Sequence, residues 1–113
     1  DTANYRWMPL DGVPGVEEKA YGTFSDCAFR SASFKLDPGA SFAAAGRGIR
    51  FVLSGRGTLA GDPYRTYTGL YLEEGETATF HAAETSEILL LGLPEIARIR
   101  RHLPQEVQAA GAR

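Results

Sequence analysis

Few side chains of this chain could perform acid–base or nucleophilic chemistry. Its histidines are His81 and His102, and its single cysteine is Cys27. Because an imidazole titrates near neutral pH, His81 is a candidate general base. Cys27 would act as a nucleophile only beside a base, and we interpret it as a small buried side chain of a strand. We interpret His81 as the end of a strand at a barrel rim, with catalysis by His81 as the alternative.

The same inventory speaks against a catalytic metal site. A divalent catalytic site needs about three protein ligands that bear nitrogen, oxygen or sulfur. Between Gly39 and Arg56 the sequence has no His, Cys, Asp or Glu. His81, Glu84 and Glu87 are close in the sequence, and we expect them to splay across a turn. The sequence therefore predicts no bound metal and no cofactor.

Arginine side chains supply a second kind of candidate chemistry. Arg50, together with Arg30, could hold a carboxylate or a phosphate through bidentate hydrogen bonds. This requires Arg50 to face the interior, whereas the alternation of Ile49 and Phe51 would put those apolar side chains inside instead. A slip of one residue exchanges the two faces of a strand, so both registers stay open. We name Arg30, Arg50 and Tyr67 as candidate binding residues for a small carboxylate, phosphate or sugar.

The elements that must position these residues are short strands separated by turns. Strands are predicted at 27–36, 47–53, 58–60, 77–81 and 87–93, with a β-prone aromatic stretch at 64–71. Asp37-Pro38-Gly39 and Ser54–Gly57 are strong turn signals between them. Several short strands at a spacing of roughly 8–12 residues predict an all-β sandwich or barrel.

The two ends of the chain differ from this middle part. We predict that residues 1–26 are an irregular or short-strand lead-in, because Pro and Gly interrupt them, and that they pack on a barrel formed by 27–93. After Pro94, apolar residues recur at helical spacing, which predicts a short C-terminal helix and tail within 94–113. A chain that opens with Asp1 is expected to be a segment of a longer protein.

Composition narrows the partners. A length of 113 residues suits one domain, and a net charge of −2 gives no reason to expect nucleic acid as the main partner. No apolar run approaches the roughly 18 residues that span a bilayer, so we expect no membrane contact. With one cysteine no intrachain disulfide can form, and we expect a cytoplasmic protein. The apolar run 88–93 and the tyrosines at 64, 67 and 71 exceed what a thin barrel wall needs. They predict a homodimer through sheet contact, or contact with another domain.

Two stretches of the sequence resemble the conserved motifs of the cupin superfamily. LDPGASF followed by RFVLSGRGTL is similar to the first motif, in which a Pro-Gly turn leads to a His-x-His pair, a Glu and a strand with a Gly-x-Gly turn. LEEGETATFHAAETSEILLLGLP is similar to the second motif. The resemblance covers roughly residues 27–94. It implies a double-stranded β-helix, that is, an RmlC-like jelly-roll barrel with a mouth suited to a small ligand.

The departures from that pattern concern the metal ligands. The family's two histidine positions fall at about Ala45 and Arg47 when counted from the first turn, or nearer Ala43 and Ala44 when counted from the second. Its Glu position falls near Gly48. The histidine position of the second motif falls at Ser86, and His81 stands where the family usually has Pro. The resemblance therefore implies a member without the usual metal ligands.

Three functional classes follow from this interpretation. The first is a non-catalytic small-molecule-binding, sensory or accessory module. The second is a metal-free isomerase or epimerase that uses His81, with Tyr67, Tyr71 and Glu84 as partners. The third is a structural oligomerisation domain. Absence of the ligand set favours the first and third classes, and the fold alone cannot choose between them.

Overall fold

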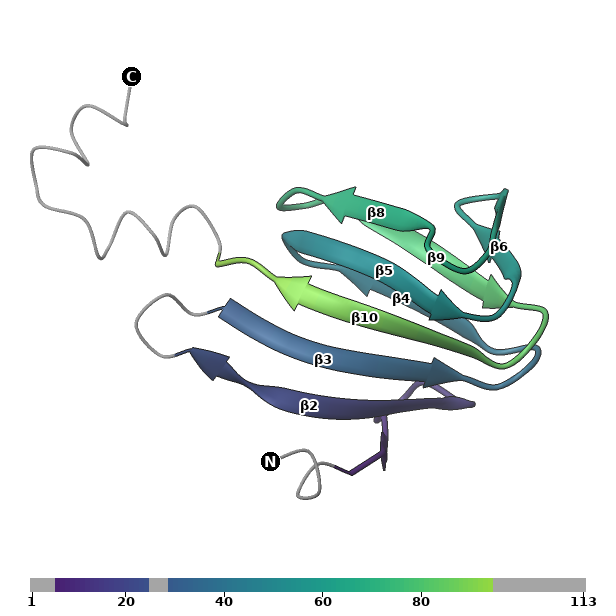
Figure 1. Ribbon diagram of the computed structural model, residues 1–113, viewed down its shortest axis with the longest axis horizontal. Helices are drawn as coiled ribbons and strands as arrows, with labels where there is room; N and C mark the ends of the chain where they lie inside the picture. Colours follow the sequence, from purple (N-terminus) through teal and green to yellow (C-terminus); the bar gives the residue numbers. More distant parts are fainter. Residues whose placement is uncertain (1–5, 25–28, 95–113) are drawn as a thin grey trace, which may run out of the picture.

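The computed structural model describes residues 6–24 and 29–94. Within these ranges the chain is built of strands that form two antiparallel sheets packed face to face (Figure 1). The strands are β1 (Met8–Pro9), β2 (Val16–Phe24), β3 (Phe29–Leu36), β4 (Ser41–Ala45), β5 (Gly48–Ser54), β6 (Gly57–Leu59), β7 (Asp62–Tyr64), β8 (Gly69–Leu72), β9 (Thr77–Ala82) and β10 (Ser86–Gly92).

The larger sheet has the strand order β1-β2-β3-β10-β5-β8, and the smaller one has the order β4-β9-β6-β7. Figure 1 shows β4 and β9 behind β5, so that the smaller sheet covers part of one face of the larger sheet. Neighbours in the larger sheet are far apart in the sequence, since β10 lies between β3 and β5. This crossed order is the jelly-roll arrangement that the sequence predicts.

Alternation along each strand decides which side chains enter the space between the sheets. In β4, Phe42 and Ala44 are buried while their neighbours are exposed, and β10 buries every second residue from Ser86 to Leu90. This period of two is what a strand with one covered face requires. The core is accordingly made of the inward residues of both sheets.

Aromatic rings fill the middle of this core. Phe42 lies between Phe34, at a centroid distance of 4.6 Å, and Phe80, at 6.5 Å. The Tyr64 ring meets the edge of Phe80 at 5.6 Å. Offset and edge-to-face pairs of this kind stabilise a core by about 0.5–1.5 kcal/mol each beyond the area they bury. This cluster ties β3 in the larger sheet to β4, β7 and β9 in the smaller one.

The predicted all-β barrel is confirmed, and the strands differ from the prediction mainly near the start. Residues 16–24 form a nine-residue strand paired with β3, with a register shift between Ala20 and Gly22, where the sequence predicted an irregular or short-strand lead-in. The charged run Glu17-Glu18-Lys19 hides this strand in the sequence, because charges are typical of a strand near a sheet edge. The small-residue stretch 41–45 is also a strand. The C-terminal helix and Cys27 fall outside the described residues. Within the described ranges no helix is long and apolar enough to cross a membrane.

Candidate functional site

Arg50 lies in the middle of β5 with its side chain between the two sheets. The strand buries Gly48, Arg50 and Val52 and exposes Ile49 and Phe51. Only 5% of the Arg50 surface is exposed. Of the two registers that the sequence left open, the structure therefore has the one in which the arginine faces inward.

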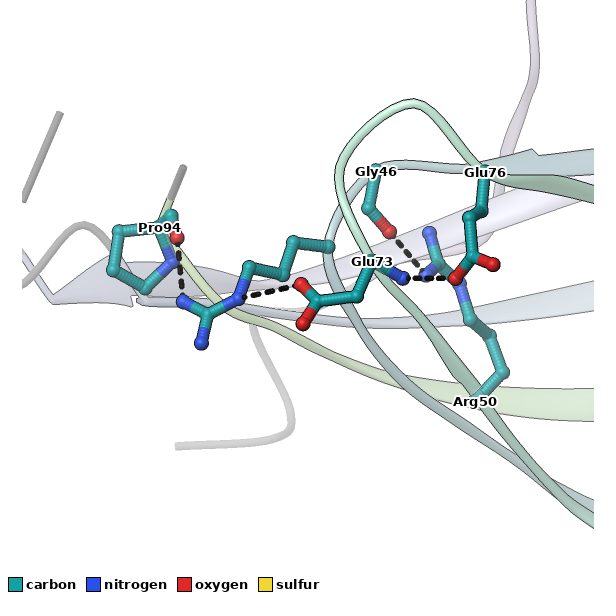
Figure 2. A network of polar contacts seen from close by, with 6 residues as sticks. Gly46, Arg50, Glu73, Glu76 and Pro94 are labelled. Atoms are coloured by element: carbon teal, nitrogen blue, oxygen red, sulfur yellow. Dashed lines mark hydrogen bonds and ion pairs between the residues drawn. The ribbon is translucent and has the colours of Figure 1, made fainter. Parts of the chain in front are cut away.

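The guanidinium of Arg50 folds back over the turn that precedes its own strand. Its Nη1 donates a hydrogen bond to the carbonyl oxygen of Gly46, and its Nη2 donates one to that of Ala45, both at 2.6 Å (Figure 2 shows the first). A guanidinium has five N–H donors, so two are used here and three stay available. Gly46 has a φ of 98°, and this left-handed turn directs its carbonyl toward the arginine.

No negative side chain in the described part of the chain neutralises this buried charge. Among the residues that the structure describes, no carboxylate lies within ion-pairing distance, 4.0 Å, of Arg50. Burial lowers the pKa of the Arg50 guanidinium, and the positive charge of Arg30 lowers it further. Both causes act in the same direction, because each opposes the charged form of Arg50. An anion bound beside it would favour the charged form and so oppose both effects.

Arg30 lies on the same inner face of the larger sheet. It pairs with Gly92, which pairs with Gly48, whereas Arg50 sits one inward row away and pairs with Leu90. The Arg30 guanidinium forms an ion pair with the carboxylate of Glu18, and half of the Arg30 side chain is exposed. Arg30 is thus the exposed cation of this inner face, and Arg50 is the buried one.

The inward residues near Arg50 are leucines and alanines. In its own row of the larger sheet, Leu70 lies on one side of Arg50, and Leu90 and then Ala32 lie on the other. In the facing sheet, Ala44 pairs with Ala78, next to the Ala45 carbonyl that Arg50 contacts. The next row toward the other end of the barrel holds Phe34, Ile88 and Val52. The row of Phe34 therefore borders the arginine on one side, and the row of Gly48 and Gly92 borders it on the other.

The other predicted residues lie elsewhere. His81 is exposed on the outer face of the smaller sheet, where its Nδ1 is 2.6 Å from the Ser41 Oγ. Tyr67 is 73% exposed and packs on Phe51 on the outer face of the larger sheet, at a centroid distance of 5.9 Å. The structure therefore brings Arg30 and Arg50 to one face but does not bring Tyr67 or His81 to them. Catalysis by His81 stays a prediction that this placement does not support.

Glu18 is the site residue that the sequence did not reveal. It pairs with Phe34 in the register of β2 and β3, so its side chain shares the inner face with Val16 and Ala20. The alternation of Val16, Glu18 and Ala20 is the signal that could have placed it there, once residues 16–24 are recognised as a strand.

The residues at the positions of the family's usual metal ligands do not fit a metal ion. Across the described ranges, no group of three His, Cys, Asp or Glu residues could hold one. The positions counted for the family's ligands carry the side chains of Ala43, Ala44, Ala45, Arg47, Gly48 and Ser86. None of these is a suitable ligand. The one charged side chain that β5 places in the interior is the cation Arg50.

A second feature lies on the opposite face of the larger sheet. We call the exposed apolar side chains there the outer patch. They come from β5, β8, β10 and the loop before β8: Ile49, Phe51, Leu53, Tyr67, Tyr71 and Leu91. Leu91, Ile49 and Tyr71 stand in one row across three neighbouring strands. Arg47, just before β5, bonds Glu73 Oε1 at 3.2 Å and the Pro94 carbonyl at 3.0 Å, and so links the end of β8 to the segment after β10 (Figure 2).

Known structures share this architecture. An RmlC-like cupin from Shewanella frigidimarina superposes with a TM-score of 0.67 at 12% identity, covering 88% of this chain and 92% of that one. An acetylacetone dioxygenase from Acinetobacter johnsonii superposes with a TM-score of 0.66 at 17% identity. The match covers 82% of this chain and 70% of that one. A chain in the complex of Rhodobacter sphaeroides SigE with the anti-sigma ChrR superposes with a TM-score of 0.65 at 16% identity. The match covers 81% of this chain and 50% of that one. No family model and no curated protein matches the sequence.

These likenesses establish the fold. The chain has the fold of the cupin structures, the double-stranded β-helix expected from its two motifs, and at such identities the comparison speaks for the fold alone. The similar structures include an enzyme and a regulatory complex. What this chain does must be argued from the residues of its own site.

Proposed function

We propose that this domain is a non-catalytic binding module that holds a small anion, a carboxylate or a phosphate group, at Arg50. One observation carries the proposal: a buried guanidinium with three unused donors has no counter-ion among the described residues. Buried charges are costly unless they are paired. An anion that enters past Arg30 would be paired with Arg50 and would accept its free N–H groups. Such a module suits a sensory or accessory role in a longer protein.

The test is anion binding by the wild-type chain and by Arg50→Gln. Acetate, citrate, phosphate and a neutral sugar are titrated at constant ionic strength, by calorimetry and by thermal unfolding. A ligand of the folded state at 100 times its Kd adds about 2.7 kcal/mol to stability. We expect at least one anion to stabilise the wild type and to lose this effect in Arg50→Gln. The sugar tests the remaining predicted ligand class.

The matched control is Arg65→Gln, which removes an exposed arginine from a turn outside the barrel. It keeps the change in net charge but leaves Arg50 intact, so it separates a specific site from the general stabilisation that phosphate gives to proteins. Arg50→Lys keeps the charge and should retain weak binding. Equal responses of the wild type and Arg50→Gln to every anion would refute the proposal.

The outer patch favours a second function, assembly of two copies through the larger sheets. Leu91 is 51% exposed and Ile49 is 42% exposed, although both are apolar and adjacent in register. A two-fold axis would let the same apolar rows of two copies cover each other. Sedimentation of the wild type and of Ile49→Thr tests this: we expect a dimer that the substitution weakens. A wild type that is monomeric at about 100 μM, in the range where dimers of ordinary affinity form, would exclude it.

A further inference from the structure

The charge balance on the inner face of the larger sheet is simple. By register, the charged side chains there among the described residues are Glu18 on β2, Arg30 on β3 and Arg50 on β5. In the smaller sheet, Asp62 pairs with the inward Leu59 but is exposed. Arg30 is already neutralised, since its guanidinium is paired with Glu18. Two positive charges and one negative charge therefore leave one net positive charge, which resides on Arg50.

We propose that Glu18 is a specificity-determining residue that limits the Arg50 site to anions with a single negative charge, such as a monocarboxylate. This inference rests on the proposed anion-binding function and deepens it. It concerns the class of ligand, whereas the proposed function concerns binding itself.

The physical reason is that a partly desolvated site tolerates little unbalanced charge. A monoanion beside Arg50 brings the inner face to neutrality. A dianion leaves a net negative charge there. Removing that charge from water costs free energy, and no positive side chain among the described inner-face residues is left to offset this cost. Glu18 also acts directly. Its ion pair engages Arg30, the arginine that would otherwise bind the second charge, and its own carboxylate repels a dianion.

The neighbouring residue provides a matched control. Glu17 lies on the same strand, but it pairs with Lys35 on the outer face, where its Oε1 is 4.0 Å from the Lys35 Nζ. Glu17→Gln and Glu18→Gln therefore make the same chemical change one residue apart, on opposite faces of β2. An effect of total charge or of the strand itself appears in both variants, and an effect on the site appears only in the second.

Sulfate and methanesulfonate are the probes, because both present a tetrahedral sulfur with oxygens but carry two charges and one charge. Their affinities are measured at constant ionic strength for the wild type, Glu18→Gln, Glu17→Gln and Arg50→Gln, with folding checked by circular dichroism. The wild type should bind methanesulfonate more tightly than sulfate. In Glu18→Gln, Arg30 is free, and the affinity for sulfate should rise about tenfold and reverse the order, as expected for one added charge in a partly exposed site. Glu17→Gln should behave as the wild type.

The failures of the two proposals look different. If the wild type binds neither probe, or binds both as well as Arg50→Gln does, the proposed function is wrong. If binding depends on Arg50 but the wild type prefers sulfate, or Glu18→Gln leaves the ratio unchanged, only the role of Glu18 is overturned. Should Glu18→Gln unfold, Arg30→Gln decides. It leaves the Glu18 carboxylate unpaired and should weaken sulfate binding more than methanesulfonate binding, and equal weakening of both would refute the inference.

Discussion

The hydroxyl groups of Tyr64 and Ser86 share a buried hydrogen bond of 2.7 Å, and the Ser86 Oγ also donates to the carbonyl of Glu84 at 2.9 Å. Tyr64 comes from the smaller sheet and Ser86 from the larger one, so this contact joins the sheets at the end of the barrel away from Arg50. Burial raises the pKa of the Tyr64 phenol, the Ser86 hydrogen bond partly offsets this, and the charge of Glu84 raises it further.

The raised pKa of Tyr64 predicts a loss of stability in alkali. In the unfolded chain the phenol titrates near its ordinary pKa of 10.0, while in the fold it keeps its proton to higher pH. Above pH 10 the unfolded state therefore binds fewer protons than the native state, and the free energy of unfolding falls as pH rises. Below the unfolded pKa this contribution is fully present.

Denaturant unfolding at several pH values from about 9 to 11 measures this slope. Tyr64→Phe should cost about 1 kcal/mol at neutral pH, through the lost hydrogen bond, and should show a shallower alkaline decline. Tyr67→Phe, which changes an exposed phenol, should decline as the wild type does. If Tyr64→Phe and the wild type fall in parallel, the buried phenol is not the cause.

Gly57 is required by the close approach of Tyr64 and the strand β9. A Cβ at this position would lie 2.8 Å from the Tyr64 Cε2 and 2.9 Å from its hydroxyl, and it would also collide with the His81 carbonyl oxygen. Gly57→Ala should therefore cost about 2–3 kcal/mol, as expected for overpacking against the backbone. Gly69→Ala is the control, since its Cβ would meet only the Phe51 ring at 3.7 Å, an ordinary contact. Equal midpoints of unfolding for the two variants would contradict this account.

Arg50→Met should stabilise the domain in the absence of anions. The substitution replaces a buried charge without a described counter-ion by an apolar chain of similar length, in a row of the larger sheet that also holds Leu70, Leu90 and Ala32. The carbonyls of Ala45 and Gly46 lose a donor but lie in exposed residues, so water can replace it. We expect the free energy of unfolding in low-salt buffer to rise by about 1 kcal/mol. A loss of 2 kcal/mol or so would mean that the two carbonyl bonds of Arg50 serve the fold rather than a ligand.

The sequence predicts the strands and turns well where local signals agree. The turn at Asp37-Pro38-Gly39 is present, with the Ala40 N–H bonded to the Asp37 carbonyl at 2.9 Å and a φ of 87° at Gly39. Buried and exposed residues alternate along β5 and β10, as expected for strands. These features depend on neighbours in the chain, which is why residue types and spacing are enough to predict them.

The faces of the strands could not be predicted in the same way. In β5 both faces carry apolar residues, because Ile49 and Phe51 build the outer patch while Val52 joins the core. Alternation alone would have turned Arg50 outward, and only the pairing with β10 and β8 places it inside. His81 is a similar case, since its neighbour Phe80 fills the core and so fixes the histidine on the outer face. Such choices depend on contacts between distant strands.

Tyr67 occupies an unfavourable backbone conformation in the turn before β8. Its φ is 72°, and the turn is closed by a hydrogen bond of 3.0 Å from the Thr68 N–H to the Arg65 carbonyl. At this third position of a turn a positive φ is ordinary for Gly or Asn, whereas other residues pay about 1–2 kcal/mol. Within one chain, packing of the Tyr67 ring on Phe51 offsets little of this free-energy cost, because most of the ring is exposed.

Tyr67→Asn should therefore stabilise the isolated chain and weaken its self-association. Ala60→Asn is the control: Ala60 also has a positive φ, 52°, in the turn between β6 and β7, but it lies outside the outer patch. Both variants should raise the free energy of unfolding of dilute protein by about 0.5–1 kcal/mol, since Asn tolerates the left-handed region. Only Tyr67→Asn should lower the dimer fraction in sedimentation. If both variants dimerise as the wild type does, the strain at Tyr67 is not maintained for assembly through this face.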